Sequence, residues 1–534
     1  MLPLLFSATT AYFTTLRLRT YLQPFQQEEY MSPRLFKWWR EKRAFDRWAT
    51  LGLLIAMPFG WLQPGAPLLT AILYLAYRCR QEPDPTVTAK KPLVITPRAH
   101  KIWLLAALLT VPFTVAIAVA PLAPWLRLFL TIALIQTLPL ALAAANLLLT
   151  PLQLLQNRRF LREAHTILTN LHPTTIGLTG SFGKTSTKYL LNHILASHAA
   201  TLATPGSVNT PLGIARVVRE QLQPQHQYFL AEMGAYGPGS IAALCRLAPP
   251  ALSCITAVGQ AHYERFKSLE AVAEAKFEIA EATFASHGTC VLHVDAIPDA
   301  LWQARVSKAP AAYRLVSNRK QILRPGDYYI ESATQSAHGL NVTLQHNGET
   351  TAITAPIFGM VQVGNLAVAF ALATELGLPA KTIAASLASV TPAPYRLNVQ
   401  QNGTQILIDD SYNANPTGFA TALETLTLLA HTNPEQARRR VLITPGMVEL
   451  GTAHGPEHTR LGTLAAANAD VILAIAPQRI PTFIQAVRAA SHTGLHQLPT
   501  LAAARLWMES HSQPDDVILI ANDLPDRYES RWTL

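Results

Sequence analysis

The pattern of hydrophobic and polar positions divides the chain into two regions. Residues 1 to about 155 are rich in Leu, Ala and Pro and contain long runs without charge, whereas residues 160–534 mix polar and apolar positions as soluble domains do. An uncharged run of about 20 residues is long enough to cross a bilayer as a helix. The pattern therefore predicts a helical membrane region, residues 1–160, followed by a soluble part.

Four membrane spans are expected in the first region. Trp103 to Leu122 and Leu128 to about Leu155 are uncharged and are expected to form one hairpin. Trp48 to Leu62 and Ala66 to Tyr77 are short for full spans and indicate either a second hairpin or one long kinked helix. Leu2 to Leu16 either adds a fifth span or lies flat in the interface. It lacks the basic start and the small-residue cleavage site of a removed signal peptide.

The soluble part predicts an α/β fold, because short apolar runs alternate with helix-like segments. The central strand-like runs are Ile176 to Thr179, Tyr228 to Glu232, Leu252 to Val258 and Cys290 to Val294. The clearest helices are expected over Lys184 to Ser197 and Ser268 to Ala285. Together these elements predict a parallel sheet flanked by helices. Residues 327–355 instead predict a small antiparallel insert with a hairpin turn at Asn347-Gly348.

A second alternating series follows the prolines of Thr391-Pro-Ala-Pro, where the preceding helix must end. Its strand-like runs are Gln405 to Ile408, Val441 to Ile443, Val471 to Ile475 and Val517 to Ile520. The series predicts a separate Rossmann-like domain, residues 394–534, after a central α/β domain, residues 161–393.

Only 14% of the residues are charged, yet the net charge is +10, and the positive residues concentrate beside the predicted spans. Apart from Arg127, every Lys and Arg of the first 162 residues lies in residues 17–47, 78–101 or 158–162. Lys and Arg mark the cytoplasmic side of membrane proteins, so a multi-pass protein of a bacterial-type cell membrane with cytoplasmic soluble domains is expected. Anionic headgroups account for the charge, and no nucleic-acid partner is expected. The four cysteines form no CxxC pair, so neither a zinc cluster nor a disulfide framework is indicated.

The segment Gly177 to Thr185 has the features of a phosphate-binding loop. Its three glycines allow left-handed or crowded backbone, so successive N–H groups can turn toward anionic oxygens. Lys184 adds a mobile positive charge, and Thr185 offers a hydroxyl to Mg²⁺ at the positive end of the following helix. ATP with Mg²⁺ is the expected ligand. The general spacing of such loops needs a glycine where Leu178 stands, and a purely structural turn is the alternative.

Seven motifs, in order along the chain, resemble those of the Mur ligases. They are Leu178-Thr-Gly-Ser-Phe-Gly-Lys-Thr-Ser, Asn209-Thr-Pro-Leu-Gly, Ala231-Glu-Met-Gly-Ala, His262-Tyr-Glu-Arg-Phe-Lys-Ser-Leu, Ala275-Lys-Phe-Glu-Ile, Asp409-Asp-Ser-Tyr-Asn-Ala-Asn-Pro and Gly446-Met-Val-Glu-Leu-Gly. The resemblance is nearest to the type that adds D-alanyl-D-alanine. It implies an ATP-dependent enzyme of cell-wall precursor synthesis that forms a peptide bond through an acyl phosphate.

The resemblance also implies roles for individual residues. Nucleotide contacts are expected from Gly180, Ser181, Gly183, Lys184, Thr185, Ser186, Asn209, Asn365, Arg396 and Asp410. Catalytic roles are expected for Lys184, His262, Lys276 and Arg396. Mg²⁺ ligands are expected at Thr185, Glu232, His262 and, if it is carbamylated, Lys276. The acceptor substrate is expected near Tyr412, Asn413 and Asn415.

Several of these residues have simpler local explanations. His262 could be a solvated loop histidine. Lys276 lies among four glutamates of one predicted helix, as a surface lysine in salt bridges would. Asn365 could cap a helix over Leu366 to Leu376, and an Asx-turn explains Asn413 to Pro416 locally. Glu232 could be structural, although a carboxylate at the end of an apolar strand more often belongs to a site.

The chain departs from the family pattern in three places. Gly359-Met-Val-Gln stands where the family has Gly-Arg-His-Asn, which removes basic residues expected near the nucleotide. Ala521-Asn-Asp-Leu-Pro-Asp stands where the D-alanyl-D-alanine type has Lys-Gly-Ser-Arg, which removes cations expected near a substrate carboxylate. The membrane region stands where soluble Mur ligases hold a uridine-diphosphate sugar. A lipid-linked precursor is therefore the expected carboxylate donor.

Three functions fit these observations. The first is a membrane-anchored peptide ligase that uses ATP, a carboxylate-bearing precursor and an amino acid or dipeptide amine. The second is a polyglutamate-type or amidating ligase, although amidating relatives carry a four-cysteine zinc insert that this sequence lacks. The third is a nucleotide-binding membrane scaffold without ligase activity, against which the intact set of site residues counts.

Overall fold

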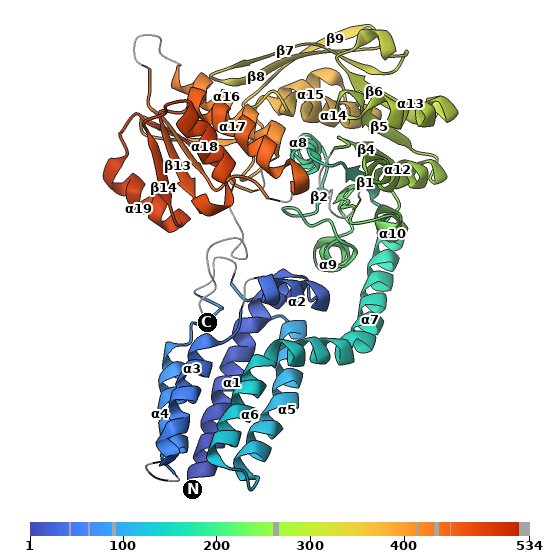
Figure 1. Cartoon of the computed structure of the whole chain (residues 1–534). Coiled ribbons are helices and arrows are strands. Elements are labelled where there is room, and N and C mark those ends of the chain that lie inside the picture. The colour runs from blue at the N-terminus through green and yellow to red at the C-terminus, as the bar shows by residue number, and fades with distance from the viewer. Residues whose placement is uncertain are drawn as a thin grey trace. The chain divides into compact units, whose positions relative to one another are not determined.

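The computed structural model describes residues 1–41, 44–61, 63, 65–87, 92–259, 266, 268–412, 415–431, 437–448 and 450–522. These residues form two compact units, residues 1–156 and residues 157–522 (Figure 1). One helix, α7 (Leu138–Leu171), begins in the first unit and ends in the second.

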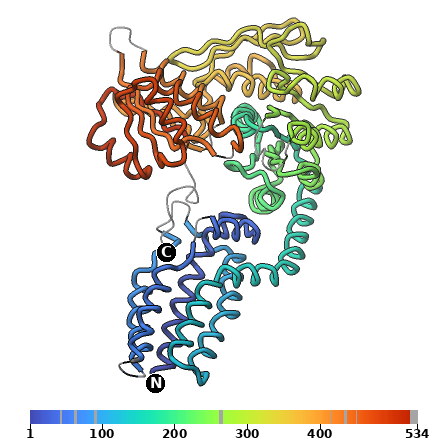
Figure 2. The backbone as a smooth tube through the Cα atoms, viewed as in Figure 1, coloured from blue at the N-terminus to red at the C-terminus, as the bar shows by residue number. Residues whose placement is uncertain are grey.

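Helices are the regular elements of the first unit, and its described residues include no strand. Its elements are α1 (Leu2–Gln27), α2 (Ser32–Glu41), α3 (Arg47–Ala56), the 3-10 turn η1 (Met57–Trp61), α4 (Ala66–Gln81), α5 (Pro97–Val119), α6 (Pro124–Gln136) and the first part of α7. Asp46 caps α3 and Thr96 caps α5, each through a side-chain oxygen that accepts a backbone N–H. In Figure 2, α1 lies beside α4 and α5, against which it packs. A bundle results.

Two of the span predictions need correction. Leu128 to Leu155 is not one helix, because α6 ends at Gln136 and α7 begins at Leu138. Pro139 has no N–H with which to continue the ladder, and the Thr137 hydroxyl donates to the carbonyls of Ala133 and Leu134, both at 3.0 Å. The span expected from Trp103 is α5, which starts six residues earlier at Pro97.

The upstream segments form two helices, α3 and α4, so the prediction of a hairpin is confirmed over that of one long kinked helix. The segment Leu2 to Leu16 is part of the longer helix α1, which belongs to the bundle. Among the described residues, α5 and α7 are the two helices long and apolar enough to cross a membrane by length and composition. The count of four spans stays a prediction.

The bundle buries charge and exposes apolar side chains. Arg17 is fully buried between two buried carboxylates, 2.7 Å from Asp46 and 3.1 Å from Glu82. The Thr20 hydroxyl also donates to Glu82. By contrast, most of the large hydrophobic side chains that the structure leaves exposed lie in residues 1–156, among them Trp48, Leu108, Trp125, Leu147 and Leu155. This distribution is the reverse of that in a water-soluble bundle.

The second unit contains a nine-stranded sheet in the order β2-β3-β1-β4-β5-β6-β7-β8-β9. Its strands are β1 (Thr174–Thr179), β2 (Thr201–Ala203), β3 (Tyr228–Glu232), β4 (Leu252–Ile255), β5 (Thr289–His293), β6 (Tyr313–Ser317), β7 (Tyr328–Ser336), β8 (Gly339–His346) and β9 (Glu349–Ala355). β2 to β7 are parallel. The prediction of a parallel α/β sheet is confirmed, with β2 and β6 added to it.

Helices cover both faces of this sheet. One apolar cluster joins the sheet to the end of α7, α9 (Pro211–Gln221), α10 (Ser240–Leu247), α12 (Leu269–Ala285) and α13 (Asp299–Lys308). A second joins it to α8 (Lys184–Ala196), α14 (Gln362–Glu375) and α15 (Ala380–Leu387). α8 and α12 confirm the two helices predicted most clearly from the sequence.

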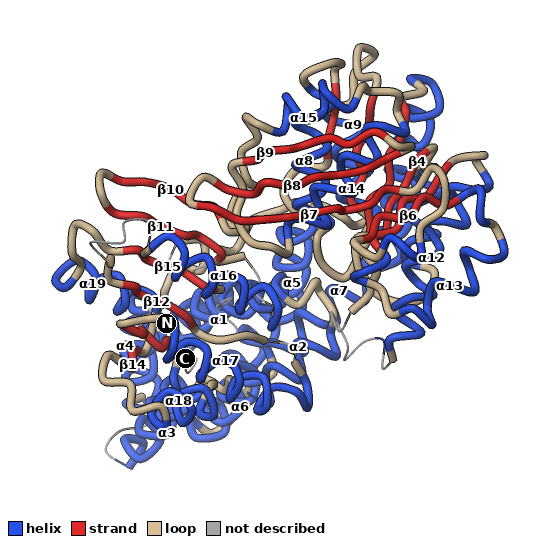
Figure 3. The backbone as a smooth tube through the Cα atoms, turned by 90° about the horizontal axis from the view of Figure 1, so that it is seen from above, coloured by secondary structure: helices blue, strands red, loops and turns tan. Residues whose placement is uncertain are grey.

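The antiparallel strands β7, β8 and β9 confirm the hairpin expected over residues 327–355. Asn347 and Gly348 form its turn with φ of 49° and 84°, which suits an Asn-Gly hairpin. In Figure 3 these strands run side by side and continue from β6. The insert is therefore an extension of the central sheet.

The remaining strands form a second sheet in the order β10-β11-β15-β12-β13-β14. They are β10 (Asn398–Asn402), β11 (Gln405–Asp410), β12 (Arg440–Thr444), β13 (Val471–Ile475), β14 (Leu495–Leu498) and β15 (Val517–Ala521). Its helices are α16 (Pro416–Ala430), α17 (His454–Asn468), α18 (Pro481–Ala489) and α19 (Leu501–His511). All strand pairs except β10–β11 are parallel, as the second alternating series predicts.

Candidate active site

The predicted phosphate loop joins β1 to α8 at the carboxyl edge of the central sheet. β1 lies between β3 and β4, so the chain crosses to opposite sides of β1 here, which is where ligands bind in such sheets. Gly183 precedes α8 with φ of 85°, and no described side chain caps this helix. Its first N–H groups are thus available to an anion. Gly177 belongs to β1 itself, where a side chain would meet Ile279 of α12.

Thr185 and Glu232, predicted as metal ligands, are brought together. The Thr185 hydroxyl, in the first turn of α8, donates to Oε2 of Glu232 at 2.9 Å. Glu232 ends β3 and is only 1% exposed. Its Oε1 accepts from the side-chain amide of Asn209 at 3.2 Å, and Asn209 accepts in turn from Tyr236 at 2.8 Å. A hydroxyl beside a carboxylate is an oxygen set suited to Mg²⁺.

Two lysines line an anion-accepting pocket beside this pair. Lys184 donates to the carbonyl of Gly180 at 2.7 Å, and burial lowers its pKa, a shift that Glu232 opposes and that Arg396 and Lys188 reinforce. This pocket is lined by residues that include Lys184, Lys276, Ser181, Asn209, Tyr236 and Phe266. None of the described lining residues is acidic. The pocket therefore favours negatively charged groups.

Lys276 is buried, with 5% of its surface exposed. Burial and the charge of Lys184 both hold its pKa well below the ordinary value. Within the described part of the chain its ammonium has no hydrogen bond or ion pair, and Glu278 of the same helix instead accepts from the backbone of Gly239 and Ala242. The alternative of a surface lysine in salt bridges is therefore wrong.

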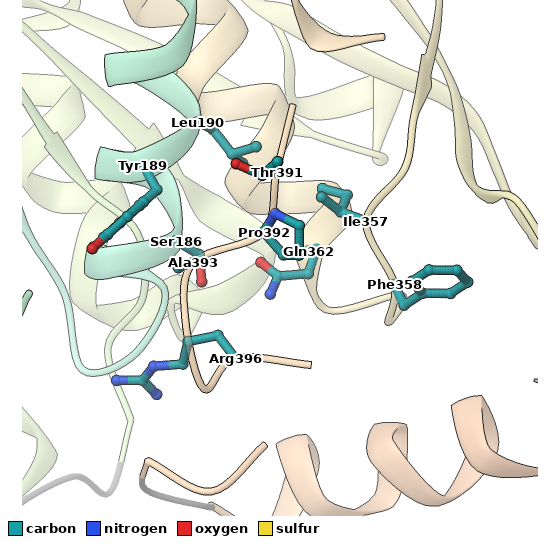
Figure 4. Close-up of a pocket in the computed structure, with 10 residues that line it drawn as sticks. All are labelled: Ser186, Tyr189, Leu190, Ile357, Phe358, Gln362, Thr391, Pro392, Ala393 and Arg396. Atoms are coloured by element: carbon teal, nitrogen blue, oxygen red, sulfur yellow. The ribbon is translucent and has the colours of Figure 1, made fainter. Parts of the chain in front are cut away.

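A second, shallow pocket lies beside α8 (Figure 4). α8 contributes Ser186, Tyr189 and Leu190, and the segment before α14 and the linker to the second sheet contribute most of the rest. Arg396 also lines it, and Figure 4 shows its guanidinium pointing away from Phe358. The apolar walls next to Ser186 are suited to a flat ring attached to phosphates.

The side chain of Asn365 packs against the phosphate loop and the first turn of α8. It lies inside the first turn of α14, donates to Gln362 at 2.7 Å and accepts from Thr187 at 3.4 Å. A side chain at Gly183 would collide with its amide oxygen. The alternative that Asn365 caps a helix from Leu366 is wrong, because α14 begins at Gln362. A direct nucleotide contact stays a prediction.

Arg396, Asp410 and Tyr412 cluster where the linker meets the second sheet. The guanidinium carbon of Arg396 lies 4.4 Å from the centre of the half-exposed Tyr412 ring, a cation–π distance. Burial raises the pKa of Asp410 to about 7, against the opposing effects of Arg396 and of the Leu397 N–H. Tyr395 and Leu397, on either side of Arg396, have φ of 61° and 49°, which strains the linker.

Of the four other residues predicted for the site, two are described by the structure and two are not. Ser181 donates to the carbonyl of Gly259 at 3.0 Å and accepts from its N–H at 2.9 Å. Asn415 is the N-cap of α16, since it accepts from Gly418 at 2.8 Å, which accounts for it locally. His262 and Asn413 lie outside the residues that the structure describes. The ligand contacts of all these residues stay predictions.

Lys188 was not predicted from the sequence, although it is central to this site. Lys188 is 1% exposed and its ammonium lies 3.0 Å from Oε2 of Glu232. The available signal was its spacing, because a lysine four residues after Lys184 lies on the same side of a helix. Tyr236 was also missed.

The fold and site define an α/β protein with a phosphate-binding loop and a second, Rossmann-like domain. Residues 178–373 match the family model of the Mur ligase middle domain, and residues 395–522 match that of the Mur ligase glutamate ligase domain. The chain belongs to the Mur ligase family.

Individual relatives agree with this assignment. The UDP-N-acetylmuramoyl-tripeptide--D-alanyl-D-alanine ligase of Mycobacterium leprae is 32% identical over 65% of this chain and 70% of its own length. That of Mycobacterium bovis is 34% identical over 55% of this chain, which spans only 56% of the relative. A crystal structure of MurF from Acinetobacter baumannii is similar with a TM-score of 0.59 and 27% identity, over 71% of this chain and 78% of that one.

Proposed function

We propose that the chain is an ATP-dependent ligase that joins a carboxylate to an amine in cell-wall precursor synthesis. The observation that carries this proposal is the arrangement after β1, where Thr185 and Glu232 lie 2.9 Å apart beside a pocket lined by Lys184 and Lys276. The names of the mycobacterial relatives support the substrate class.

The proposed chemistry proceeds in two steps. A carboxylate oxygen of the donor attacks the γ-phosphorus of ATP, the bond from that phosphorus to the β–γ bridging oxygen breaks, and ADP leaves. The amine nitrogen then attacks the carbonyl carbon of the acyl phosphate, inorganic phosphate leaves, and the nitrogen loses a proton to solvent. Positioning and charge stabilisation supply most of the catalysis in phosphoryl transfer.

Residues of the loop are suited to the first step. Lys184 and the uncapped N-terminus of α8 would bind phosphate oxygens. Thr185 and Glu232 fit a Mg²⁺ ion, which when bound neutralises charge on the phosphates. Lys276 as an ammonium lies against the like charge of Lys184. Its carbamate would instead place an anion there, which supports the proposal that Lys276 is carbamylated.

The apolar pocket beside Ser186 is proposed to hold the adenine ring. Tyr189, Leu190, Ile357 and Pro392 supply its apolar walls. Arg396, from the strained linker, lies close enough to affect the pKa of Lys184. It is therefore suited to contact the same phosphates as Lys184.

We also propose that residues 1–156 form a multi-pass membrane anchor with the catalytic domains on the cytoplasmic side. The exposed apolar side chains of this unit and its buried Arg17–Asp46–Glu82 cluster support lipid surroundings. If this is correct, the full chain will stay with membranes after an alkaline carbonate wash. Recovery in the supernatant would contradict the anchor.

A membrane anchor makes a lipid-linked precursor the proposed carboxylate donor. In liposomes, the full chain should then process a lipid-linked donor faster than the same peptide on a soluble uridine-diphosphate sugar. Equal rates on both donors would contradict this substrate assignment while leaving the ligase activity intact.

Phosphate release tests the ligase itself. The detergent-purified full chain, with ATP and Mg²⁺, is tested on a panel of lipid-linked and soluble carboxylates combined with amino acids and dipeptides. A ligase releases phosphate only when both substrates are present, and Lys184→Ala should abolish the release. Lys308→Ala, a change at an exposed lysine of α13, is the matched control. Nucleotide binding without release across the whole panel would favour the scaffold.

A further inference from the structure

Lys188 is a fully buried cation that does not line either pocket of the active site. It lies on α8 one turn after Lys184, and its ammonium donates to three oxygens. These are Oε2 of Glu232 at 3.0 Å, the carbonyl of Gly206 at 2.5 Å and, more weakly, the hydroxyl of Thr204 at 3.5 Å. All three ammonium protons are used within the protein.

The acceptor that matters most is Oε2 of Glu232. The same oxygen accepts the Thr185 hydroxyl, so it is the Glu232 oxygen directed toward the proposed metal position. Oε1 is engaged by Asn209 on the other side. The carboxylate oxygen that a divalent cation would use is therefore already paired with an ammonium.

The rest of the site adds positive charge. Lys184 and Lys276 lie in the adjoining pocket, and among the described residues no group of three His, Cys, Asp or Glu could hold a metal ion. The ammonium of Lys188 lies 3.0 Å from Glu232, and Lys184 is close enough for this carboxylate to oppose the lowering of its pKa. An ammonium a few ångströms from a divalent cation weakens its binding by more than tenfold, even at an effective dielectric constant of about 20.

We propose that Lys188 is the counter-cation of Glu232 in the nucleotide-free enzyme and keeps the metal position closed to free divalent cations. The metal ion binds only when nucleotide phosphates bring negative charge and further oxygen ligands. This inference rests on the proposed function, because it assigns a role to Lys188 within that nucleotide site. Lys188 is a positioning residue, since it acts through Glu232.

A merely structural role predicts a different result. Lys188 also connects the segment Thr204–Gly206 to α8 through hydrogen bonds, so its loss would loosen the site in general. A loosened site would bind free metal and nucleotide-bound metal more weakly. Removal of a counter-cation instead strengthens the binding of free metal, so the direction of the change separates the two roles.

Manganese titration of the full chain in detergent measures that direction, with free Mn²⁺ followed by its paramagnetic resonance signal. Wild type should bind Mn²⁺ weakly alone and tightly with ADP. Lys188→Met and Lys188→Gln should bind Mn²⁺ at least about tenfold more tightly than wild type in the absence of ADP. Lys188→Arg, which keeps the charge, and Lys308→Met, the matched surface control, should behave as wild type.

The outcomes separate this inference from the proposed function. Unchanged or weaker binding of free Mn²⁺ by both neutral variants overturns the role of Lys188, even if wild type binds Mn²⁺ with ADP. Failure of wild type to bind Mn²⁺ with ADP overturns both proposals. Lys188→Gln retains a donor for the Gly206 carbonyl, so it provides the result if Lys188→Met does not fold.

Discussion

The hydroxyl of Thr185 donates a 2.9 Å hydrogen bond to the carboxylate of Glu232. This bond joins the first turn of α8 to the end of β3, the strand next to β1 in the sheet. It therefore brings the helix that follows the predicted phosphate loop and a buried carboxylate to one point. The activity and stability of the second unit should both depend on it.

Replacement of Glu232 tests the buried charges at this point. In Glu232→Gln the ammonium of Lys188 is left buried without its counter-charge, which should cost about 3–5 kcal/mol in the free energy of unfolding. Binding of Mn²⁺ with ADP should be lost as well. Differential scanning calorimetry in detergent measures the first effect. Glu270→Gln, the same substitution at an exposed glutamate, is the control. It should change the free energy of unfolding by less than about 0.5 kcal/mol.

Lys276 should show a conflict between activity and stability. Its ammonium is buried beside Lys184 and is unpaired among the described residues. In bicarbonate-free buffer, where the proposed carbamate does not form, Lys276→Met removes that unfavourable charge, so the free energy of unfolding should rise by about 1–2 kcal/mol. Phosphate release should fall by about 10²–10³-fold, because a group at the reacting carboxylate is lost. A variant destabilised in bicarbonate-free buffer would show that the ammonium of Lys276 is paired in the unmodified protein.

Asp410 should make stability depend on pH. Its pKa is about 7 in the folded chain, raised by burial from an ordinary value of 3.8. The folded state holds the proton more tightly than the unfolded state, so this stabilisation is complete below pH about 4 and is lost as pH rises through 7. Asp410→Asn does not titrate. The unfolding temperature of Asp410→Asn minus that of wild type should therefore increase from pH 5 to pH 8, and a constant difference would contradict the raised pKa.

Two arginines of α1 provide a matched pair for the first unit. Arg17→Leu leaves Asp46 and Glu82 buried without their cation and should lower the free energy of unfolding by about 3–5 kcal/mol. Arg19 lies 3.7 Å from Asp84, and both side chains are partly exposed. Arg19→Leu should therefore change the free energy of unfolding by no more than about 1 kcal/mol. Thermal unfolding in detergent compares the two, and equal effects would show that the buried cluster contributes little.

The elements around the phosphate loop were predictable because local signals agree there. An apolar run, a glycine-rich turn and a helix with Lys184 and Thr185 in its first turn follow one another, and β1 and α8 are found where expected. The hairpin at Asn347-Gly348 was predictable for the same reason, since both residues adopt the positive φ that its turn needs. The pairing of Thr185 with Glu232 follows from parallel strands that end at one edge.

Other features depend on contacts distant in sequence. β10 and β14 are short and polar and become strands only by pairing at the edges of the second sheet. The break between α6 and α7 depends on Pro139. Proline carries no charge, so the uncharged run from which one span was predicted continues through it. The burial of Lys188 depends on contacts with Glu232 from β3 and Gly206 from the loop after β2, both distant from it in sequence.

Oxygen-18 labelling of the donor carboxylate tests whether this carboxylate is activated as an acyl phosphate. The full chain in detergent is given ATP, Mg²⁺, an amine and a donor whose carboxylate is labelled with oxygen-18, and the released phosphate is analysed by mass spectrometry. Activation through an acyl phosphate predicts one labelled oxygen in the inorganic phosphate for each amide formed. Amide formation with unlabelled phosphate would contradict carboxylate activation at this site.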